Sequence, residues 1–143
     1  MTSSEEIEAI RLLKARYFRL MDTKDWEGLA AVFTDDVLVD MTGEGGVVTH
    51  GAHEFVRTLR QHIEEVTTVH HGHTPEVEIT SATTANGVWA MEDRLWWSPG
   101  GPFRHLHGFG HYHETYEKTA DGWRIKTLVL TRLHREVDPE GAM

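Results

Sequence analysis

The chain has 143 residues, a length that fits one domain built around a single core. A formal net charge of -9, without clustered Lys and Arg, excludes a role that depends on binding nucleic-acid phosphates. The absence of cysteine excludes disulfides, thiolate metal sites and thiol nucleophiles. With no signal-peptide pattern and no apolar run near the roughly 20 residues of a membrane span, we expect a soluble cytoplasmic protein without membrane contact.

The N-terminal segment has the pattern of two amphipathic helices. Apolar residues recur at helical spacing over residues 7–21, and Ser3 or Ser4 is the expected cap of this first helix. Asp25 is the expected cap of a second helix, whose apolar stripe extends to Phe33 before an acidic stop.

Strand patterns dominate the rest of the chain. Residues 37–41 alternate as a short strand that glycines interrupt, and residues 52–65 return to helical spacing after Gly51. Four long aromatic or β-branched runs follow, with turn residues such as Asn86-Gly87 between them. These runs cover residues 69–80, 87–97, 104–118 and 123–136.

The order of these elements predicts an α+β fold. Four consecutive long strands indicate an antiparallel meander, and helices grouped before them indicate one helical layer on the sheet. We expect a cone-shaped α+β barrel in which three N-terminal helices pack on a strongly curved, mainly antiparallel sheet. A single domain is expected over residues 1–137, followed by a loose tail over residues 138–143.

Eleven histidines make the composition unusual, and most of them lie between His50 and His113. Imidazole changes its charge near neutral pH and is a common metal ligand. Proton transfer, metal binding and pH sensing are therefore the kinds of chemistry to weigh.

Three stretches of the sequence carry a resemblance to a known family. They are YFRLMDTKDWEGLAAVFTDDV, TTVHHGH and GHYHETYEKTADGWRIKTLVLTRL. On these stretches the chain resembles the SnoaL-like branch of the nuclear transport factor 2-like superfamily, over about residues 5–136. The first and last stretches are signatures of the fold, whereas the histidine-rich stretch bears on chemistry.

The resemblance implies a catalytic site. Relatives that catalyse dehydration or dehydrochlorination, such as bile-acid 7α-dehydratase and hexachlorocyclohexane dehydrochlorinase, have a histidine base and an aspartate partner at the positions of His70 and Asp22. The bile-acid enzyme adds a tyrosine and a second aspartate, which match Tyr17 and Asp93. The resemblance thus implies four catalytic residues and no metal or organic cofactor.

Elementary chemistry gives separate support for the pair of Asp22 and His70. A carboxylate at the C-terminus of a helix opposes the helix dipole, so Asp22 should have a positively polarised partner. It would fix the tautomer of His70 while the other ring nitrogen takes a proton from substrate. The alternatives are an ordinary turn aspartate and a core histidine satisfied by the backbone.

The places of Tyr17 and Asp93 depend on geometry that the sequence leaves open. Five residues turn a helix by about 140°, so Tyr17 and Asp22 converge only in a wide pocket or near the helix end. Asp93 shares its strand parity with Trp89, and it lines the pocket only if that parity faces inward.

Other charged residues on the strands have more than one interpretation. His105 and His107 are about 7 Å apart on one strand face and could hold a metal ion. More often such a ladder of histidines is a solvated face or the contact with a second subunit, while His111 could line the cavity. Arg132 could receive an anionic substrate group or end the strand in a salt bridge.

We expect a cofactor-independent lyase or isomerase that acts on a small, hydrophobic, cyclic molecule. Elimination and isomerisation share the first step, loss of a proton from carbon. The alternatives are a non-catalytic ligand-binding protein, an epoxide hydrolase and a metal-dependent enzyme. The expected pocket wall consists of apolar residues and one histidine, namely Phe18, Met21, Phe33, Phe55, Trp89, Met91, Leu95, Trp97, Phe109 and His111.

A homodimer is the expected assembly. An exposed sheet face rich in Trp96, Tyr112, Tyr116 and histidines should be covered by a second copy, and relatives commonly pair through this face.

Overall fold

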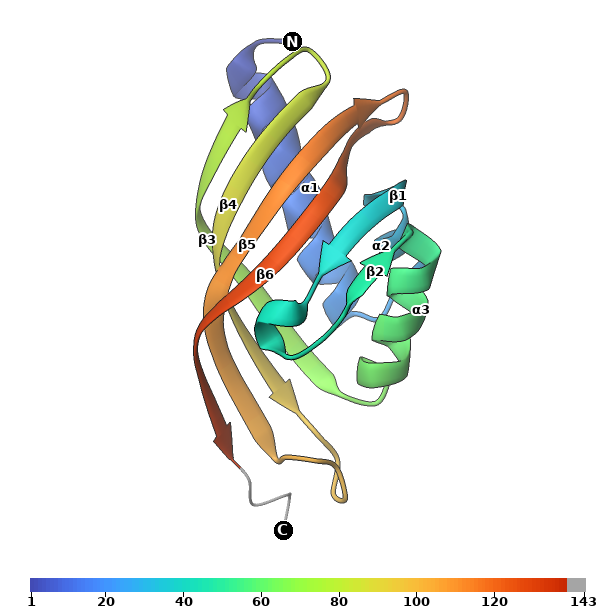
Figure 1. The fold of residues 1–143 in the computed structure, drawn as a ribbon, viewed down its shortest axis with the longest axis vertical. Helices are drawn as coiled ribbons and strands as arrows, with labels where there is room; N and C mark the ends of the chain where they lie inside the picture. The colour runs from blue at the N-terminus through green and yellow to red at the C-terminus, as the bar shows by residue number, and fades with distance from the viewer. Residues whose placement is uncertain (139–143) are drawn as a thin grey trace.

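The computed structural model describes residues 1–138, which form three α-helices and a six-stranded sheet (Figure 1). The sheet is mixed and is not closed, with strand order β2-β1-β6-β5-β4-β3. Strand β1 pairs with β6 in parallel, and every other pair in the sheet is antiparallel. The helices are α1 (Ser3–Asp22), α2 (Trp26–Ala30) and α3 (Ala52–Ile63), with a short 3-10 helix η1 (Thr42–Glu44). The strands are β1 (Phe33–Asp40), β2 (Val48–His50), β3 (Thr67–Ile79), β4 (Thr84–Trp96), β5 (His105–Thr119) and β6 (Gly122–Asp138).

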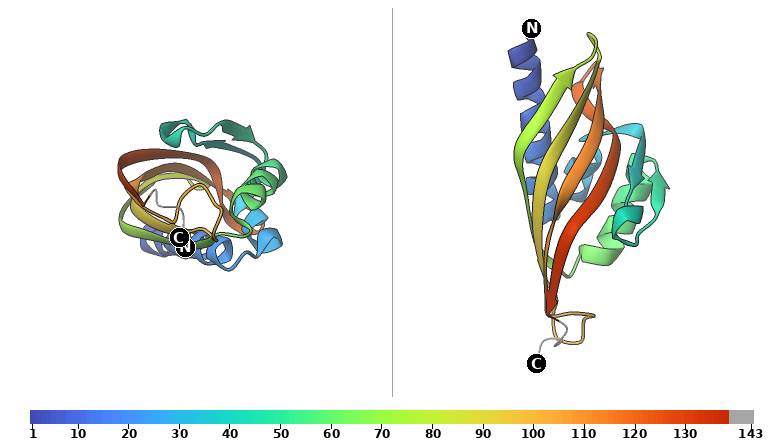
Figure 2. Two further views of the ribbon diagram at one scale, coloured as in Figure 1. Left: turned by 90° about the horizontal axis from the view of Figure 1, so that it is seen from below. Right: turned by 60° about the vertical axis from the view of Figure 1, so that its left-hand side comes forward.

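The architecture confirms the predicted α+β fold, with three helices packed on a curved sheet. Helix α1 packs against the sheet next to β3, and α3 lies beside β1 and β2 (Figures 1 and 2). Strand β6 runs to Asp138, one residue into the expected tail, and the rest of that tail lies outside the described residues. Within residues 1–138, no helix is long and apolar enough to cross a membrane.

Local side-chain caps determine where the first two helices begin. Thr2, rather than Ser3 or Ser4, caps α1 and forms a reciprocal capping box with Glu5. Asp25 caps α2 as predicted and accepts a hydrogen bond of 2.9 Å from the backbone N–H of Gly28. The expected extension of this helix to Phe33 is wrong. Phe33 instead starts β1, because pairing with β6 outweighs the helical spacing.

The long strands agree with the predicted runs, but one predicted turn is wrong. Asn86-Gly87 lies inside β4, and the chain reverses at Ser81, where Thr80 N–H donates to the Thr84 carbonyl at 3.0 Å. Gly87 has a packing reason instead, because a Cβ there would lie 2.9 Å from the Tyr116 hydroxyl oxygen.

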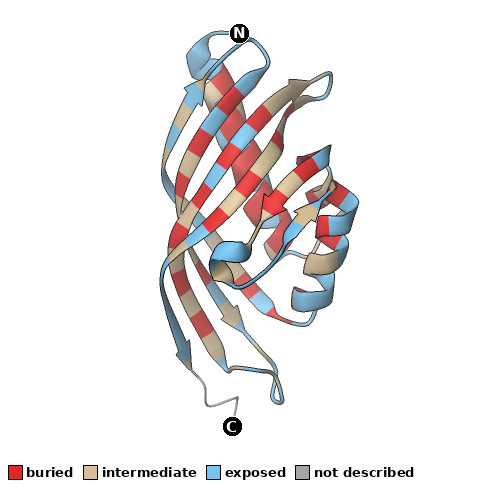
Figure 3. Cartoon of the chain, in the orientation of Figure 1, coloured by how far each residue is buried: buried red, intermediate tan, exposed pale blue. Residues whose placement is uncertain are grey.

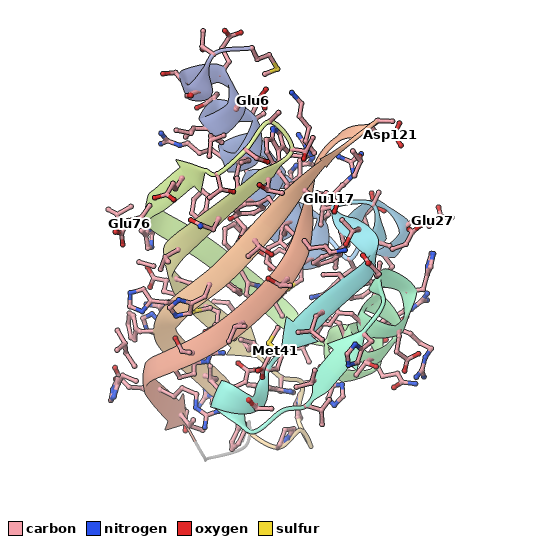
Figure 4. All side chains as sticks on the ribbon, turned by 45° about the horizontal axis from the view of Figure 1, so that its top comes forward. Glu6, Glu27, Met41, Glu76, Glu117 and Asp121 are labelled. Atoms are coloured by element: carbon pink, nitrogen blue, oxygen red, sulfur yellow. The ribbon has the colours of Figure 1, made fainter. Side chains whose placement is uncertain are left out.

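The two faces of the sheet differ sharply in burial (Figure 3). We call the face that packs against α1 the inner face and the opposite one the outer face. On β4 the residues of Trp89 parity, including Asp93, are on the inner face, and Asp93 is only 3% exposed. Surface acidic residues such as Glu27, Glu76 and Asp121 point away from the body of the molecule (Figure 4).

The parity of β5 corrects two predictions. Phe109 and His111 were expected in the pocket wall, but they lie on the outer face, opposite the buried residues of the same strand. Glycines fix this parity: a Cβ at Gly108 would lie 2.3 Å from Arg132 Nη1, and one at Gly110 would lie 2.0 Å from the backbone oxygen of Thr131. Only glycine fits these inner positions, so the intervening side chains must face outward.

The predicted sheet face for dimer formation is also partly wrong. Tyr112 and Tyr116 are buried on the inner face, with 2% and 1% exposure, and cannot contact a second copy. Trp96 does lie exposed on the outer face.

Candidate active site

Asp22 and His70 meet where the end of α1 crosses β3. His70 Nδ1 lies 2.7 Å from Asp22 Oδ1, and the backbone N–H of His70 donates to Asp22 Oδ2 at 2.8 Å. The His70 side chain is 9% exposed and that of Asp22 is 20% exposed. The carboxylate therefore holds both the ring and the backbone of His70.

Asp22 is the last residue of α1, where its charge opposes the helix dipole. Besides the two contacts with His70, it accepts a hydrogen bond from Thr68 Oγ1 at 2.9 Å. Thr68 in turn accepts one from Lys24 Nζ at 2.9 Å. Three donors from β3 thus offset the unfavourable position of the carboxylate at the helix end.

A second carboxylate, Asp93, lies on the other side of the imidazole. His70 and Asp93 are partners in the β3–β4 register, so both side chains project from the inner face. Asp93 Oδ2 is 3.9 Å from His70 Nε2. The histidine therefore lies between two carboxylates, with Nδ1 bound to one and Nε2 directed toward the other.

Arg132 on β6 binds Asp93 through two parallel hydrogen bonds. Its Nη1 and Nη2 donate to Asp93 Oδ1 and Oδ2 at 2.7 and 2.9 Å. Nη2 and Nε also donate to Glu44 Oε1 at 2.8 and 3.1 Å. Burial would lower the pKa of Arg132, but the hydrogen bonds and charges of Asp93 and Glu44 outweigh it and raise that pKa above its usual range.

Tyr17 lies in the core next to these residues, but no hydrogen bond joins it to Asp22 or His70 in the described part of the chain. Its ring is 1% exposed and packs edge-on against the rings of Phe18, Phe33 and Tyr112, with centroids 5.3–6.0 Å apart. Burial raises the pKa of the Tyr17 hydroxyl, a hydrogen bond with Tyr112 offsets part of this rise, and the charges of Glu114, Glu44 and Asp22 add to it. The group stays protonated near neutral pH, so it can donate a hydrogen bond.

A hollow of about 490 Å³ opens at the dyad between α1 and β3. Asp22 and His70 both line it, together with Phe18 and Trp89 from the predicted wall. The rest of its lining comes from Arg11, Ala15, Arg19 and residues 71–73. Its volume is within the range of small-molecule sites.

The other residues of the predicted wall do not line this hollow. Four of them, Met21, Phe33, Phe55 and Met91, are buried in the hydrophobic core, and Leu95 and Trp97 pack against it. Phe33 also borders a second hollow of about 560 Å³ that is separate from the dyad.

Two residues that contact the site, Thr68 and Glu44, were not predicted from the sequence. Thr68 had a usable signal, because it shares strand parity with His70 two positions later. Glu44 had none, since it lies in the glycine-rich segment of η1, far in sequence from Arg132. Arg132 itself was predicted with two interpretations, and the structure places it in a salt bridge.

The pair of histidines expected to be able to hold a metal ion has other contacts. The rings of His105 and His107 have centroids 6.4 Å apart, and His107 Nε2 lies 2.8 Å from Glu92 Oε2. His105 stacks on Trp96 at 4.9 Å. Both belong to the outer face and are separate from the dyad.

The chain is similar to known proteins in both sequence and fold. A family model described as "SnoaL-like domain" matches residues 2–129. "Probable cyclase FGR4" from Gibberella zeae is 24% identical over 141 residues, which covers 92% of this chain and 94% of the relative. A "Putative Scytalone Dehydratase" structure from Novosphingobium aromaticivorans is 22% identical with a TM-score of 0.82, covering 96% of this chain and 95% of that one. The hexachlorocyclohexane dehydrochlorinase LinA-type3 from Novosphingobium barchaimii is 18% identical with a TM-score of 0.79, covering 91% and 88%. At these identities the structural likenesses show a shared fold.

Proposed function

The chain belongs to the SnoaL-like domain family, and from this premise we propose that it is a small-molecule lyase or isomerase in which His70 removes a proton from carbon. One observation carries the proposal: His70 Nδ1 lies 2.7 Å from Asp22 Oδ1, which leaves Nε2 to act as the base. The proposal needs no metal ion or organic cofactor. Neighbours in fold that are described as a dehydratase and as dehydrochlorinases are compatible with it.

The proposed first step is general base catalysis. Asp22 holds the Nδ1 proton, so the lone pair of Nε2, on the side of Asp93, is left free to accept a proton. Nε2 takes a proton from a carbon next to a carbonyl or a leaving group, and the C–H electron pair becomes an enolate or a new double bond. The imidazolium that forms is stabilised by the charge of Asp22.

The second half of the proposed reaction is assigned to Tyr17 and Asp93, which lie behind the lining of the hollow and are 1% and 3% exposed, so substrate has to enter the inner face to reach them. In an elimination the C–O bond breaks, and the departing oxygen takes a proton from the Tyr17 hydroxyl, which solvent later restores. In an isomerisation the same hydroxyl donates a hydrogen bond to the enolate oxygen, and His70 returns its proton to another carbon. Asp93, held by Arg132, orients the substrate on the Nε2 side of the ring.

The proposed substrate class is a compact, mainly apolar ring system. Phe18 and Trp89 supply flat apolar walls at the dyad, and the hollow accommodates a molecule of two or three fused rings. Arg11 and Arg19 also line the hollow and would favour a substrate with a polar or anionic substituent.

Hydrogen exchange at carbon tests the first step of the proposed reaction, which elimination and isomerisation have in common. The protein is incubated in D2O with a panel of cyclic ketones, and deuterium uptake next to the carbonyl is followed by NMR. His70→Gln and Asp22→Asn should each slow the exchange by about 10²–10⁴-fold. His113→Gln, a histidine on the outer face, is the matched control and should exchange like the parent protein.

The same panel separates the proposal from its rival, a non-catalytic binding protein. Ligands that bind at the hollow and show no exchange above buffer, with both parent and His70→Gln protein, would favour simple binding. Exchange that persists in His70→Gln would rule out His70 as the base.

A second candidate function rests on a different observation. Asp93, Arg132 and Glu44 form a carboxylate–arginine–carboxylate group, which resembles the Asp-Arg-Asp set that another branch of this fold uses around water for epoxide hydrolysis. Formation of a diol from a cyclic epoxide by His70→Gln protein, lost in Asp93→Asn, would favour this candidate. Diol formation that requires His70, or no diol at all, would exclude it.

We also propose that the protein forms a homodimer through the outer face. Trp96 leaves a large apolar side chain exposed on this face, and such residues gather at contacts between subunits. A monomeric mass by light scattering at micromolar concentration would contradict this assembly.

A further inference from the structure

Three side chains on the outer face converge in a way that the proposed reaction does not use. His71 and His73 alternate on β3, and Glu92 on β4 is the register partner of His71. One ligand atom from each of the three lies within 4.8 Å of the others. Two imidazoles and a carboxylate are a donor set that binds divalent transition metals well.

The spacing of the donors is close to that of a metal site. His73 Nε2 lies 3.2 Å from Glu92 Oε1. Zinc binds nitrogen and oxygen at about 2.0–2.2 Å, so neighbouring ligands in a tetrahedral site lie roughly 3.3–3.5 Å apart. These two atoms are therefore already near the required separation, and a ring nitrogen of His71 lies within 4.8 Å of a ligand atom from each of these two residues.

His107 on β5 supports the carboxylate from behind. Its Nε2 is 2.8 Å from Glu92 Oε2, the oxygen that does not face His73. In metal sites, a hydrogen bond to a ligating carboxylate orients it in this manner.

The backbone that carries the two histidines is fixed, while their rings are accessible. Gly72 between them faces inward so closely that a Cβ would lie 2.7 Å from the Phe18 ring. The His73 side chain is 49% exposed and that of Glu92 is 30% exposed, so an ion can reach the site from solvent.

We propose that His71, His73 and Glu92 bind one divalent transition-metal ion, zinc being the best suited, with a fourth position open to water. The three side chains project from the outer face, whereas Asp22 and His70 are on the inner face, although His71 and His73 also border the hollow at His70. The inference uses neither Asp22 nor His70 and does not rest on the proposed function.

The test uses full-length protein without an affinity tag, because a histidine tag would bind the same ions. Zinc binding is measured by titration calorimetry, and cobalt replaces zinc to give a visible absorption band for a four-coordinate site. We expect one zinc ion per chain at micromolar affinity. His73→Ala and Glu92→Gln should each weaken binding by at least about 100-fold, and His107→Ala by about 10–100-fold.

The chain offers a matched control on the neighbouring strand. His111 and His113 have the same spacing, with ring centroids 6.2 Å apart against 6.1 Å for His71 and His73. They face Ala90 and Val88 across β4 and have no carboxylate opposite. The variant with both replaced by alanine should bind zinc like the parent protein.

Three results would overturn the proposal. The first is no zinc binding at 100-fold excess over micromolar protein. The second is binding that survives both His73→Ala and Glu92→Gln, and the third is an equal loss in the control with His111 and His113 replaced. Because all these side chains are on the surface of the sheet, circular dichroism should show that every variant remains folded.

Discussion

The salt bridge between Arg132 and Asp93 gives the sharpest prediction about stability. Asp93 is 3% exposed, and both of its oxygens accept hydrogen bonds from the guanidinium. In Arg132→Met both hydrogen bonds are lost, and His70 Nε2, 3.9 Å away, is too far to replace them. Leaving a buried carboxylate without its cation costs about 3–5 kcal/mol. For a domain of this size the loss corresponds to a fall in Tm of roughly 10–20 °C.

The reverse substitution should cost much less. In Asp93→Asn, Arg132 keeps both hydrogen bonds to Glu44, and the asparagine oxygen still accepts one from the guanidinium. We expect a loss of about 1–2 kcal/mol, the order of one weakened charged hydrogen bond. The double variant should be more stable than the sum of the single losses predicts, by about 1–3 kcal/mol.

Urea unfolding followed by tryptophan fluorescence measures all three variants at pH 7. Arg135→Met, on the exposed part of the same strand, is the control and should stay within about 0.5 kcal/mol of the parent protein. Equal losses for the two single variants, which then add in the double variant, would refute the argument. Such a result would mean that the guanidinium does not hold a buried charge.

Three further predictions concern the core. Burial raises the pKa of Tyr17, so the stability that its neutral hydroxyl contributes is complete below the unfolded pKa near 10 and declines above it by up to about 1.4 kcal/mol per pH unit. In Tyr17→Phe the free energy of unfolding, measured with urea at pH 10.5–11.5, should therefore fall less steeply with pH than in the parent protein. An unchanged slope would contradict this. Gly108→Ala should lower the free energy of unfolding by about 1–3 kcal/mol in the same assay, because the added Cβ would collide with Arg132 and Asp93. An unchanged free energy of unfolding would mean that these side chains move aside without cost. The buried carboxylate of Glu114, 3% exposed, pairs with the ammonium of Lys14 at 2.5 Å, so Lys14→Met should lower Tm by at least 10 °C in calorimetry. Lys126→Met, which breaks an exposed ion pair, is the control and should lower Tm much less. Equal shifts in Tm would contradict the importance of the buried pair.

The sequence was sufficient for the elements whose period is long and unambiguous. Apolar spacing over residues 7–21 predicted α1, and the four long runs predicted β3 to β6 within a few residues. The errors fall where a short local signal competes with tertiary pairing. Phe33 fits a helical stripe, but pairing with β6 makes it a strand residue, and Asn86-Gly87 has the composition of a turn inside a continuous ladder.

The site could be predicted to different depths for different residues. The proximity of Asp22 and His70 followed from a family resemblance and from the poor position of a carboxylate at a helix end. Strand parity could not be read in β5, because alternating histidines and glycines give no apolar side to assign inward. The glycine contacts that settle the parity belong to other strands, so Phe109 and His111 were placed on the wrong face.

Side chains alternate along β3, so the neighbouring residues His70 and His71 face opposite sides of the sheet. His70 is held from the inner side at its backbone N–H and at Nδ1, both by Asp22, so its orientation does not depend on what occupies the outer face. His71 and His73 face the other way, toward Glu92. A metal ion bound there would therefore leave the hydrogen bond from Nδ1 to Asp22 and the direction of Nε2 unchanged. His71 and His73 also border the hollow, so any zinc inhibition of deuterium exchange at a substrate carbon should be relieved by Glu92→Gln. A strong inhibition that Glu92→Gln does not relieve would point to binding at His70 itself.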